Sequence, residues 1–148
     1  MKGYAAWIAA LLVSGAALAE YPDKPIRLVV PFAPGGVTDT SGRVVADALA
    51  KRLGQSIIVE NKPGASGNIG TLQVVQASPD GYTLVLGFDG TLVINPHVFE
   101  KFPFDVTTDL APVGKIGDAT LILVAHPSLQ PKTLPDLIAY SKKQPNGV

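Results

Sequence analysis

The sequence predicts an α/β fold in which helices cover both faces of a parallel sheet. Short apolar, β-branched runs alternate with longer segments of helical period, in the order strand, helix, strand, helix, strand. Gly and Pro residues are concentrated at the junctions between these segments, where ordered chains turn. Such alternation is typical of a parallel sheet, because a helix usually carries the chain from one parallel strand to the next.

The first nineteen residues have the pattern of a secretion signal. Lys2 supplies a positive start, residues 5–13 are apolar, and Ala17-Leu18-Ala19 is an A-x-A cleavage pattern. The apolar run is shorter than the roughly 20 residues that span a bilayer. We therefore expect a signal peptide, residues 1–19, that is cleaved after Ala19. A retained N-terminal helix or membrane anchor is the alternative.

The composition argues against several classes of partner. Removal of Lys2 turns twelve basic residues into eleven, against twelve acidic ones, and no basic stripe is present. Nucleic acid is therefore not an expected partner. The sequence contains no Cys, which excludes disulfides and thiolate metal sites. Apart from the leader, no segment is long and apolar enough to be transmembrane, so we expect a soluble mature chain.

A buried strand is predicted over residues 26–32, because this apolar run ends in Pro and Gly. A helix is predicted after it, with N-cap side chains offered by Thr38, Asp39 and Thr40 and an end at Gly54. The spacing i, i+4 predicts an apolar face of Val44, Val45, Ala48, Leu49 and Leu53, and a solvent face of Arg43, Asp47 and Lys51.

The middle of the chain repeats this alternation. A second strand is predicted over residues 56–60 and a second helix over residues 68–77, with Ser66 or Asn68 near its cap. Residues 78–81, Ser-Pro-Asp-Gly, are typical of a turn, and a third strand is predicted over residues 82–86.

The pattern after Gly87 is less regular. Residues 95–109 are predicted to be a long connection, and residues 121–125 a buried strand. Thr133 is predicted to cap a last helix, which ends at residues 145–147. The long connection is the best candidate for a crossing between domains. We therefore expect a first lobe over residues 20–104 and the start of a second lobe over residues 105–148.

Two glycine-containing loops, residues 31–39 and 64–70, lead from predicted strand ends into predicted helix starts. Ligands of parallel α/β sheets bind at this end of the sheet. The unpaired N–H groups of a helix start donate to anions, and the helix dipole adds about 0.3–1 kcal/mol per charge. The candidate ligand-binding residues are Phe32, Ala33, Pro34, Gly35, Gly36, Thr38 and Asp39 in the first loop, Ala65, Ser66, Gly67 and Asn68 in the second, and Asp89 and Thr91 after the third strand.

Each of these features has a structural alternative. Either loop is also compatible with a tight strand-to-helix turn that binds nothing. Asp39 next to an anion site would repel the ligand, so its role is an N-cap or an internal contact, or else a contact to an amino group of the ligand. Thr91 either donates to the same ligand or lies in a plain turn.

Catalytic and nucleotide-binding patterns are weak in this sequence. It has no G-x-x-x-x-G-K-[ST] phosphate loop and no G-x-S-x-G nucleophile motif, and the glycines at 64, 67 and 70 have the wrong spacing for a dinucleotide fingerprint. His97 and His126 are far apart and lack neighbouring ligands. We therefore expect a protein that is not an enzyme and that has no cofactor and no metal; an exported hydrolase is the disfavoured alternative.

Four stretches resemble one known family. They are the opening Tyr21 to Gly36, which continues through Arg43, then Val59 to Gly70, Pro79 to Leu84, and Asn95-Pro96. Together with the leader, they resemble the substrate-binding receptors of tripartite tricarboxylate transporters, also called Bug proteins. The resemblance covers nearly the whole chain.

The resemblance implies a periplasmic-binding-protein-like fold, in which two α/β lobes close over a ligand in the periplasm. It implies a small carboxylate or related solute as ligand, a membrane permease as partner and in some members a sensor protein, and we expect a monomer. In the family, the loops that match Phe32–Thr38 and Ala65–Asn68 meet ligand carboxylates through backbone N–H groups and water.

The sequence departs from the family pattern in two places. Residues 90–94 replace a Ser/Thr-Thr-His-Ala stretch that relatives often carry, which leaves the ligand undefined. Family members are also much longer than this chain, so we expect a sequence truncated inside the second lobe. A truncated fragment without a transport function, or one that serves only in interactions, is therefore the alternative to a working receptor.

Overall fold

The computed structural model describes residues 20–120 and 122–144. The predicted signal peptide, Leu121 and the predicted end of the last helix lie outside the described residues. Two compact units are present, a first that ends at Gly114 and a second that begins at Lys115. The lobe boundary expected at residues 104 and 105 stays a prediction. None of the helices in the described ranges has the length and apolar character that crossing a membrane requires.

The first unit is built on a parallel sheet of three strands, as predicted. They are β1 (Ile26–Val30), β2 (Ile57–Asn61) and β3 (Thr83–Val85), in the spatial order β2-β1-β3. Leu28 of β1 lies opposite Val59 of β2 and Leu84 of β3. β1 is apolar over nearly its whole length because, as the central strand, it is covered on both faces.

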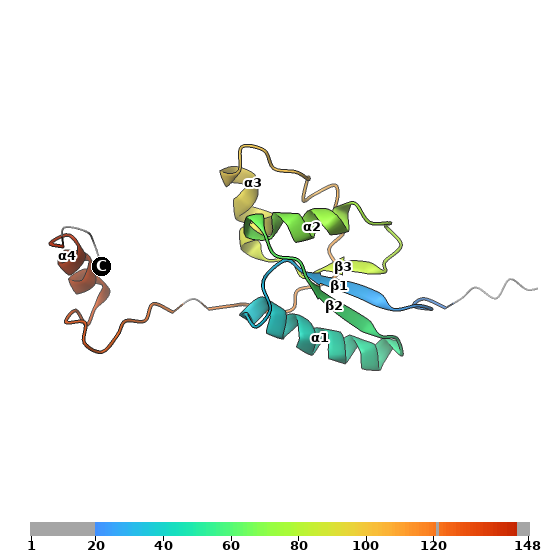
Figure 1. The fold of residues 1–148 in the computed structure, drawn as a ribbon, viewed down its shortest axis with the longest axis horizontal. Helices are drawn as coiled ribbons and strands as arrows, with labels where there is room; N and C mark the ends of the chain where they lie inside the picture. Colours follow the sequence, from blue (N-terminus) through green and yellow to red (C-terminus); the bar gives the residue numbers. More distant parts are fainter. Residues whose placement is uncertain (1–19, 121, 145–148) are drawn as a thin grey trace, which may run out of the picture. The chain divides into compact units, whose positions relative to one another are not determined.

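Helices cover both faces of this sheet, which confirms the predicted fold class. Figure 1 shows α1 (Val37–Leu53) on one face and α2 (Asn68–Val75) on the other. The core on the α1 face consists of Leu28, Val30, Ala46 and Leu86. This packing holds α1 against the face of the sheet.

The apolar face predicted for α1 is wrong in part. Val44 is 65% exposed, whereas Gly42 and Ala46 are buried. A Cβ added at Gly42 would lie 3.1 Å from Val30 and 3.2 Å from Leu86, so the absence of a side chain there lets the helix approach the sheet. This close contact decides which face of the helix turns inward.

The N-cap side chains predicted for α1 are wrong, whereas Ser66 and Asn68 flank the cap of α2, as predicted. Gly36 is the N-cap of α1 and Gly67 that of α2, and neither helix has a side-chain cap. Asp39 lies inside the first turn of α1 and accepts a hydrogen bond from the Gly35 N–H at 2.9 Å. The predicted end at Gly54 is confirmed, because this glycine has a left-handed conformation with φ of 67°.

The segment after β3 is helical where the sequence predicted irregular chain. A π-helical turn, η3 (Gly90–Ile94), continues into the short helix α3 (Asn95–Val98).

In the second unit, the strand predicted at residues 121–125 is wrong for the described part: residues 122–125 are exposed and not in a strand. They have no neighbouring strand in the described part of that unit, and a strand needs one for its backbone hydrogen bonds. The cap of α4 (Leu134–Ser141) is confirmed, since Thr133 accepts from the Asp136 N–H.

Candidate functional site

Three chain segments meet at the carboxyl edge of the sheet: the β1–α1 loop (residues 31–36), the β2–α2 loop (residues 62–67) and the segment after β3 (residues 86–91). The Phe32 and Phe88 rings pack edge to face, with centroids 5.5 Å apart. The Thr91 hydroxyl donates to the Ser66 carbonyl at 2.8 Å. Parallel strands deliver their carboxyl ends to one edge, so the fold brings together segments that are distant in sequence.

The β1–α1 loop is held in place by Asp39, whose side chain is buried. Its carboxylate accepts from Gly35 N–H at 2.9 Å, from the Asn61 amide at 2.9 Å and from the Arg43 guanidinium at 2.9 and 3.1 Å. Asn61 also donates to the Phe32 carbonyl at 3.1 Å. These contacts tie the loop to the end of β2.

The same contacts keep Asp39 ionised. The Arg43 guanidinium, and then the Gly35 N–H and the Asn61 amide, lower the pKa of the Asp39 carboxyl from 3.8 to about 2. Its charge is paired, so the repulsion of an anion that the sequence suggested is largely offset within the protein. Both carboxylate oxygens are already engaged, which favours the internal-contact interpretation of Asp39.

Sequence reasoning missed Asn61 and the partner of Arg43. Asn61 is the last residue of β2, and a polar side chain at the carboxyl end of a predicted strand was the available signal. Arg43 was predicted on a solvent face with Asp47. It is exposed, as predicted, but its guanidinium bonds Asp39 one turn earlier and donates to the Asn61 side-chain oxygen at 3.1 Å.

The start of α1 carries unpaired backbone donors. The first turn of any α-helix has N–H groups without an intrahelical acceptor, and no side chain caps this one. Gly35 precedes the N-cap, and its N–H is occupied because it donates to Asp39. The exposed residues of this loop are Ala33, Pro34, Gly35 and Gly36, while Thr38 is half-buried.

The β2–α2 loop has an unusual left-handed conformation. Four successive residues have positive φ: Gly64 at 134°, Ala65 at 46°, Ser66 at 53° and Gly67 at 91°. Two of them are not glycine, and a left-handed conformation is uncommon for such residues. Ala65 and Ser66 are both exposed.

This conformation leaves two adjacent N–H groups free. The Gly64 carbonyl accepts from Gly67 N–H at 3.0 Å, and the Ala65 carbonyl accepts from Asn68 N–H. In a planar trans peptide the N–H points opposite to its carbonyl, so the N–H groups of Ala65 and Ser66 point away from the first turn of α2. Neither donates to any residue in the part of the chain that the structure describes. Gly67 N–H is occupied, but these two are available to an anion.

The other predicted donors are engaged inside the protein. Thr91 is 1% exposed, and its hydroxyl is bonded to Ser66. The side-chain oxygen of buried Asn68 accepts from Asn95 at 2.7 Å. Exposed Asp89 accepts from the Gly90 N–H at 2.9 Å. The structure therefore brings the predicted residues together, but it favours backbone amides over these side chains as ligand donors.

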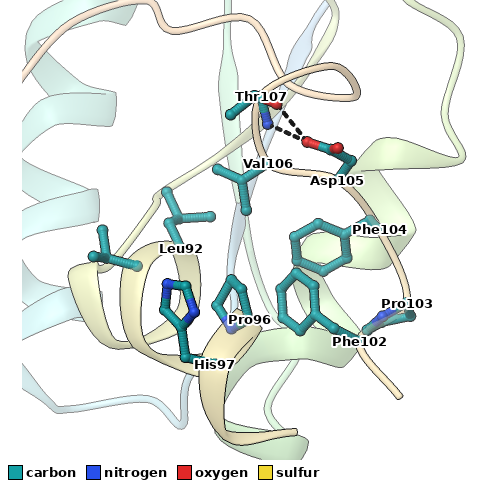
Figure 2. Close-up of a pocket in the computed structure, with 10 residues that line it drawn as sticks. Leu92, Pro96, His97, Phe102, Pro103, Phe104, Asp105, Val106 and Thr107 are labelled. Atoms are coloured by element: carbon teal, nitrogen blue, oxygen red, sulfur yellow. Dashed lines mark hydrogen bonds between the residues drawn. The ribbon is translucent and has the colours of Figure 1, made fainter. Parts of the chain in front are cut away.

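An open hollow of about 800 Å³ lies elsewhere in the first unit, on residues 92–107. Figure 2 shows apolar side chains such as Leu92, Phe102 and Phe104 along it, and at its rim Asp105 accepts two hydrogen bonds from Thr107. It contains none of the predicted ligand-binding residues. Its surface suits an anion poorly, so the candidate site remains the loop edge.

Comparison with known proteins gives consistent results. A family model described as "Tripartite tricarboxylate transporter family receptor" matches residues 42–148. Protein BugT of Bordetella pertussis is 42% identical over 129 residues, which cover 86% of this chain and 40% of BugT. The chain thus spans about two fifths of the length of the curated relatives it matches.

Two solved structures extend this similarity to the fold. The structure of Rpa4515 from R. palustris with adipate is 34% identical, with a TM-score of 0.72 over 85% of this chain and 42% of that one. The structure of MatC from Rhodopseudomonas palustris with bound malate is 40% identical, with a TM-score of 0.58 over 60% of this chain and 30% of that one.

Proposed function

Because the chain belongs to the family of tripartite tricarboxylate transporter receptors, we propose that it captures a small carboxylate in the periplasm for a membrane permease. The observation that carries this proposal is the pair of free N–H groups at Ala65 and Ser66, in a loop packed beside the β1–α1 loop. The closeness of the two loops is measured at Gly67, where an added Cβ would lie 3.3 Å from the Phe32 ring.

The geometry of the site suits a carboxylate ligand, and the site needs no charged side chain as a hydrogen-bond donor. A carboxylate has two acceptor oxygens, and the site offers the two adjacent amides of the β2–α2 loop and the first turn of α1. The positive ends of the two helix dipoles add to the attraction. The Phe32–Phe88 pair, with Phe88 41% exposed, offers apolar surface for the carbon chain of the ligand.

The ligand class is proposed to be a dicarboxylate. The related structures carry adipate and malate, which each have two carboxyl groups. One carboxylate would be held at the loop edge of the first lobe, residues 20–104. The other would be held by a second lobe that begins at residue 105, and closure of the lobes would bury the ligand. The receptor would act as a monomer that docks on its permease.

The N–H groups of α1 are tested by replacing Val37, the first residue of the helix. Proline at a first helical position removes an N–H without breaking the helix, and the extended backbone of Gly36 suits a following proline. Val37→Pro should weaken adipate or malate binding about tenfold, the value of one hydrogen bond to a charged group. Val37→Ala, which keeps the N–H, is the matched control.

Calorimetry on the full natural chain measures both variants. The unsubstituted protein should bind at least one of adipate and malate. Absence of binding to these and to a wider set of carboxylates would refute the proposal. Equal affinities of the proline and alanine variants would remove α1 from the site.

A further inference from the structure

We propose that Thr91 and Asn95 are positioning residues that hold the Ala65–Ser66 turn in its left-handed conformation and so keep its two N–H groups directed at the ligand. The inference deepens the proposed function and rests on it for the identity of the ligand. Neither side chain would touch the carboxylate; both would act through the Ser66 carbonyl.

The first step is that this turn needs external support. Ala65 and Ser66 both have positive φ, at 46° and 53°. A non-glycine residue in this region has a higher conformational free energy than in the ordinary helical or extended regions. Such a conformation persists only where surrounding contacts over-determine it.

The second step is that the support is present and buried. The Ser66 carbonyl accepts two hydrogen bonds, from the Thr91 hydroxyl at 2.8 Å and from the Asn95 amide at 3.0 Å. Asn95 also donates to the Asn68 side chain at 2.7 Å. Thr91 is 1% and Asn95 6% exposed, so water has little access to replace either donor.

The third step connects these bonds to the free amides. The carbonyl of Ser66 is fixed toward the interior, which fixes the ψ of Ser66 and the peptide that follows it. Without its donors, Ala65 and Ser66 would relax toward negative φ, and rotation of the Ala65–Ser66 peptide would turn the Ser66 N–H away from its present direction. The two donors therefore determine where the amides point.

A steric observation supports this arrangement. A Cβ added at Gly67 would lie only 2.4 Å from the Thr91 hydroxyl oxygen. Thr91 therefore reaches the Ser66 carbonyl because the neighbouring residue has no side chain. The segment after β3 contributes to the site by shaping the β2–α2 loop.

The experiment removes each donor without changing side-chain volume much. Thr91→Val deletes the hydroxyl, Thr91→Ser keeps it, and Asn95→Leu removes the amide. Calorimetry with adipate should show binding about tenfold weaker for Thr91→Val and Asn95→Leu, and within about twofold of the unsubstituted protein for Thr91→Ser. Leu28→Val, which removes volume from the core on the α1 face of the sheet, controls for lost stability and should leave adipate affinity unchanged.

A second measurement does not depend on the ligand. The ¹H–¹⁵N resonances of Ala65 and Ser66 in the ligand-free protein, with their φ-dependent couplings, should shift in Thr91→Val and in Asn95→Leu and stay in place in Thr91→Ser. Unchanged resonances in both donor-deleted variants would overturn the inference, whatever the adipate affinities of these variants are. Asn95→Leu also keeps the test decisive if Thr91→Val fails to fold.

The two proposals fail in different ways. If the unsubstituted protein binds adipate and the donor-deleted variants bind it equally well, the positioning role is refuted and the proposed function stands. If the unsubstituted protein binds no carboxylate while the resonances shift as expected, the proposed function is refuted and the control of the turn by Thr91 and Asn95 stands.

Discussion

The Arg43 guanidinium binds the Asp39 carboxylate with two nitrogens, Nη2 at 2.9 Å from Oδ1 and Nε at 3.1 Å from Oδ2. This two-point contact joins one turn of α1 to the next. Since Asp39 also accepts from Gly35 and Asn61, the pair connects α1, the β1–α1 loop and the end of β2. This ion pair therefore helps to hold the β1–α1 loop, which forms part of the proposed ligand site.

The Asp39 contacts predict a loss of stability in acid. The folded pKa of Asp39 is lowered from 3.8 to about 2, so its contribution is fully present above pH about 4 and is lost as the pH falls toward 2. Asp39→Asn should remove this part of the pH dependence. Melting temperatures of both proteins between pH about 5 and 2 measure it. The pKa values of Glu60, Asp80 and Asp105 are also lowered, so the difference between the proteins is the decisive quantity. Parallel melting curves would contradict the prediction.

Arg43→Lys should not be a conservative change. Lysine keeps the charge but cannot donate to both oxygens of Asp39 and to Asn61 from one planar group. We expect weaker carboxylate binding and a lower melting temperature than in Lys51→Arg, a control on the exposed face of α1. Melting and calorimetry check both effects, and a lysine variant that matches the unsubstituted protein would show that the two-point contact is dispensable.

Gly67→Ala should be much more damaging than Gly54→Ala. Both glycines have positive φ, at 91° and 67°. An added Cβ at Gly54 meets nothing within 4 Å, whereas at Gly67 it meets Thr91 and Phe32. We expect a loss of about 1 kcal/mol of unfolding free energy at Gly54 and of about 2–4 kcal/mol at Gly67. Urea denaturation measures both, and equal losses would argue against the tight packing of the three segments.

Two substitutions test which residues form the core between α1 and the sheet, one at an exposed residue of α1 and one at a buried residue of β1. Val44→Ala removes a side chain that is 65% exposed and should change the unfolding free energy by less than about 0.5 kcal/mol. Leu28→Ala removes a buried side chain from the core and should cost about 2–5 kcal/mol. Denaturation of the two variants compares them, and a large effect at Val44 would support the apolar face that the i, i+4 spacing predicted.

The sequence alone determined the order of strands and helices, the parallel sheet and the edge at which the candidate site lies. Apolar period, turn residues and glycine positions are local patterns, and local backbone preference is sufficient to predict such elements. The predicted strand was wrong at residues 122–125, because pairing with a second strand is not a local property.

The tertiary structure decided which polar groups are occupied and which are free. The sequence offers Thr91, Asn68 and Asp39 as donors or ligand contacts, but packing commits their side chains to partners inside the protein. Packing instead leaves the backbone N–H groups of Ala65 and Ser66 free to bind a ligand. Every residue except proline has such a group, so the residue types alone do not show which N–H groups are free. A hydrogen-bond partner is chosen by distance, and Thr91 meets Ser66 across 25 positions of the chain only after three parallel strands have brought their ends to one edge.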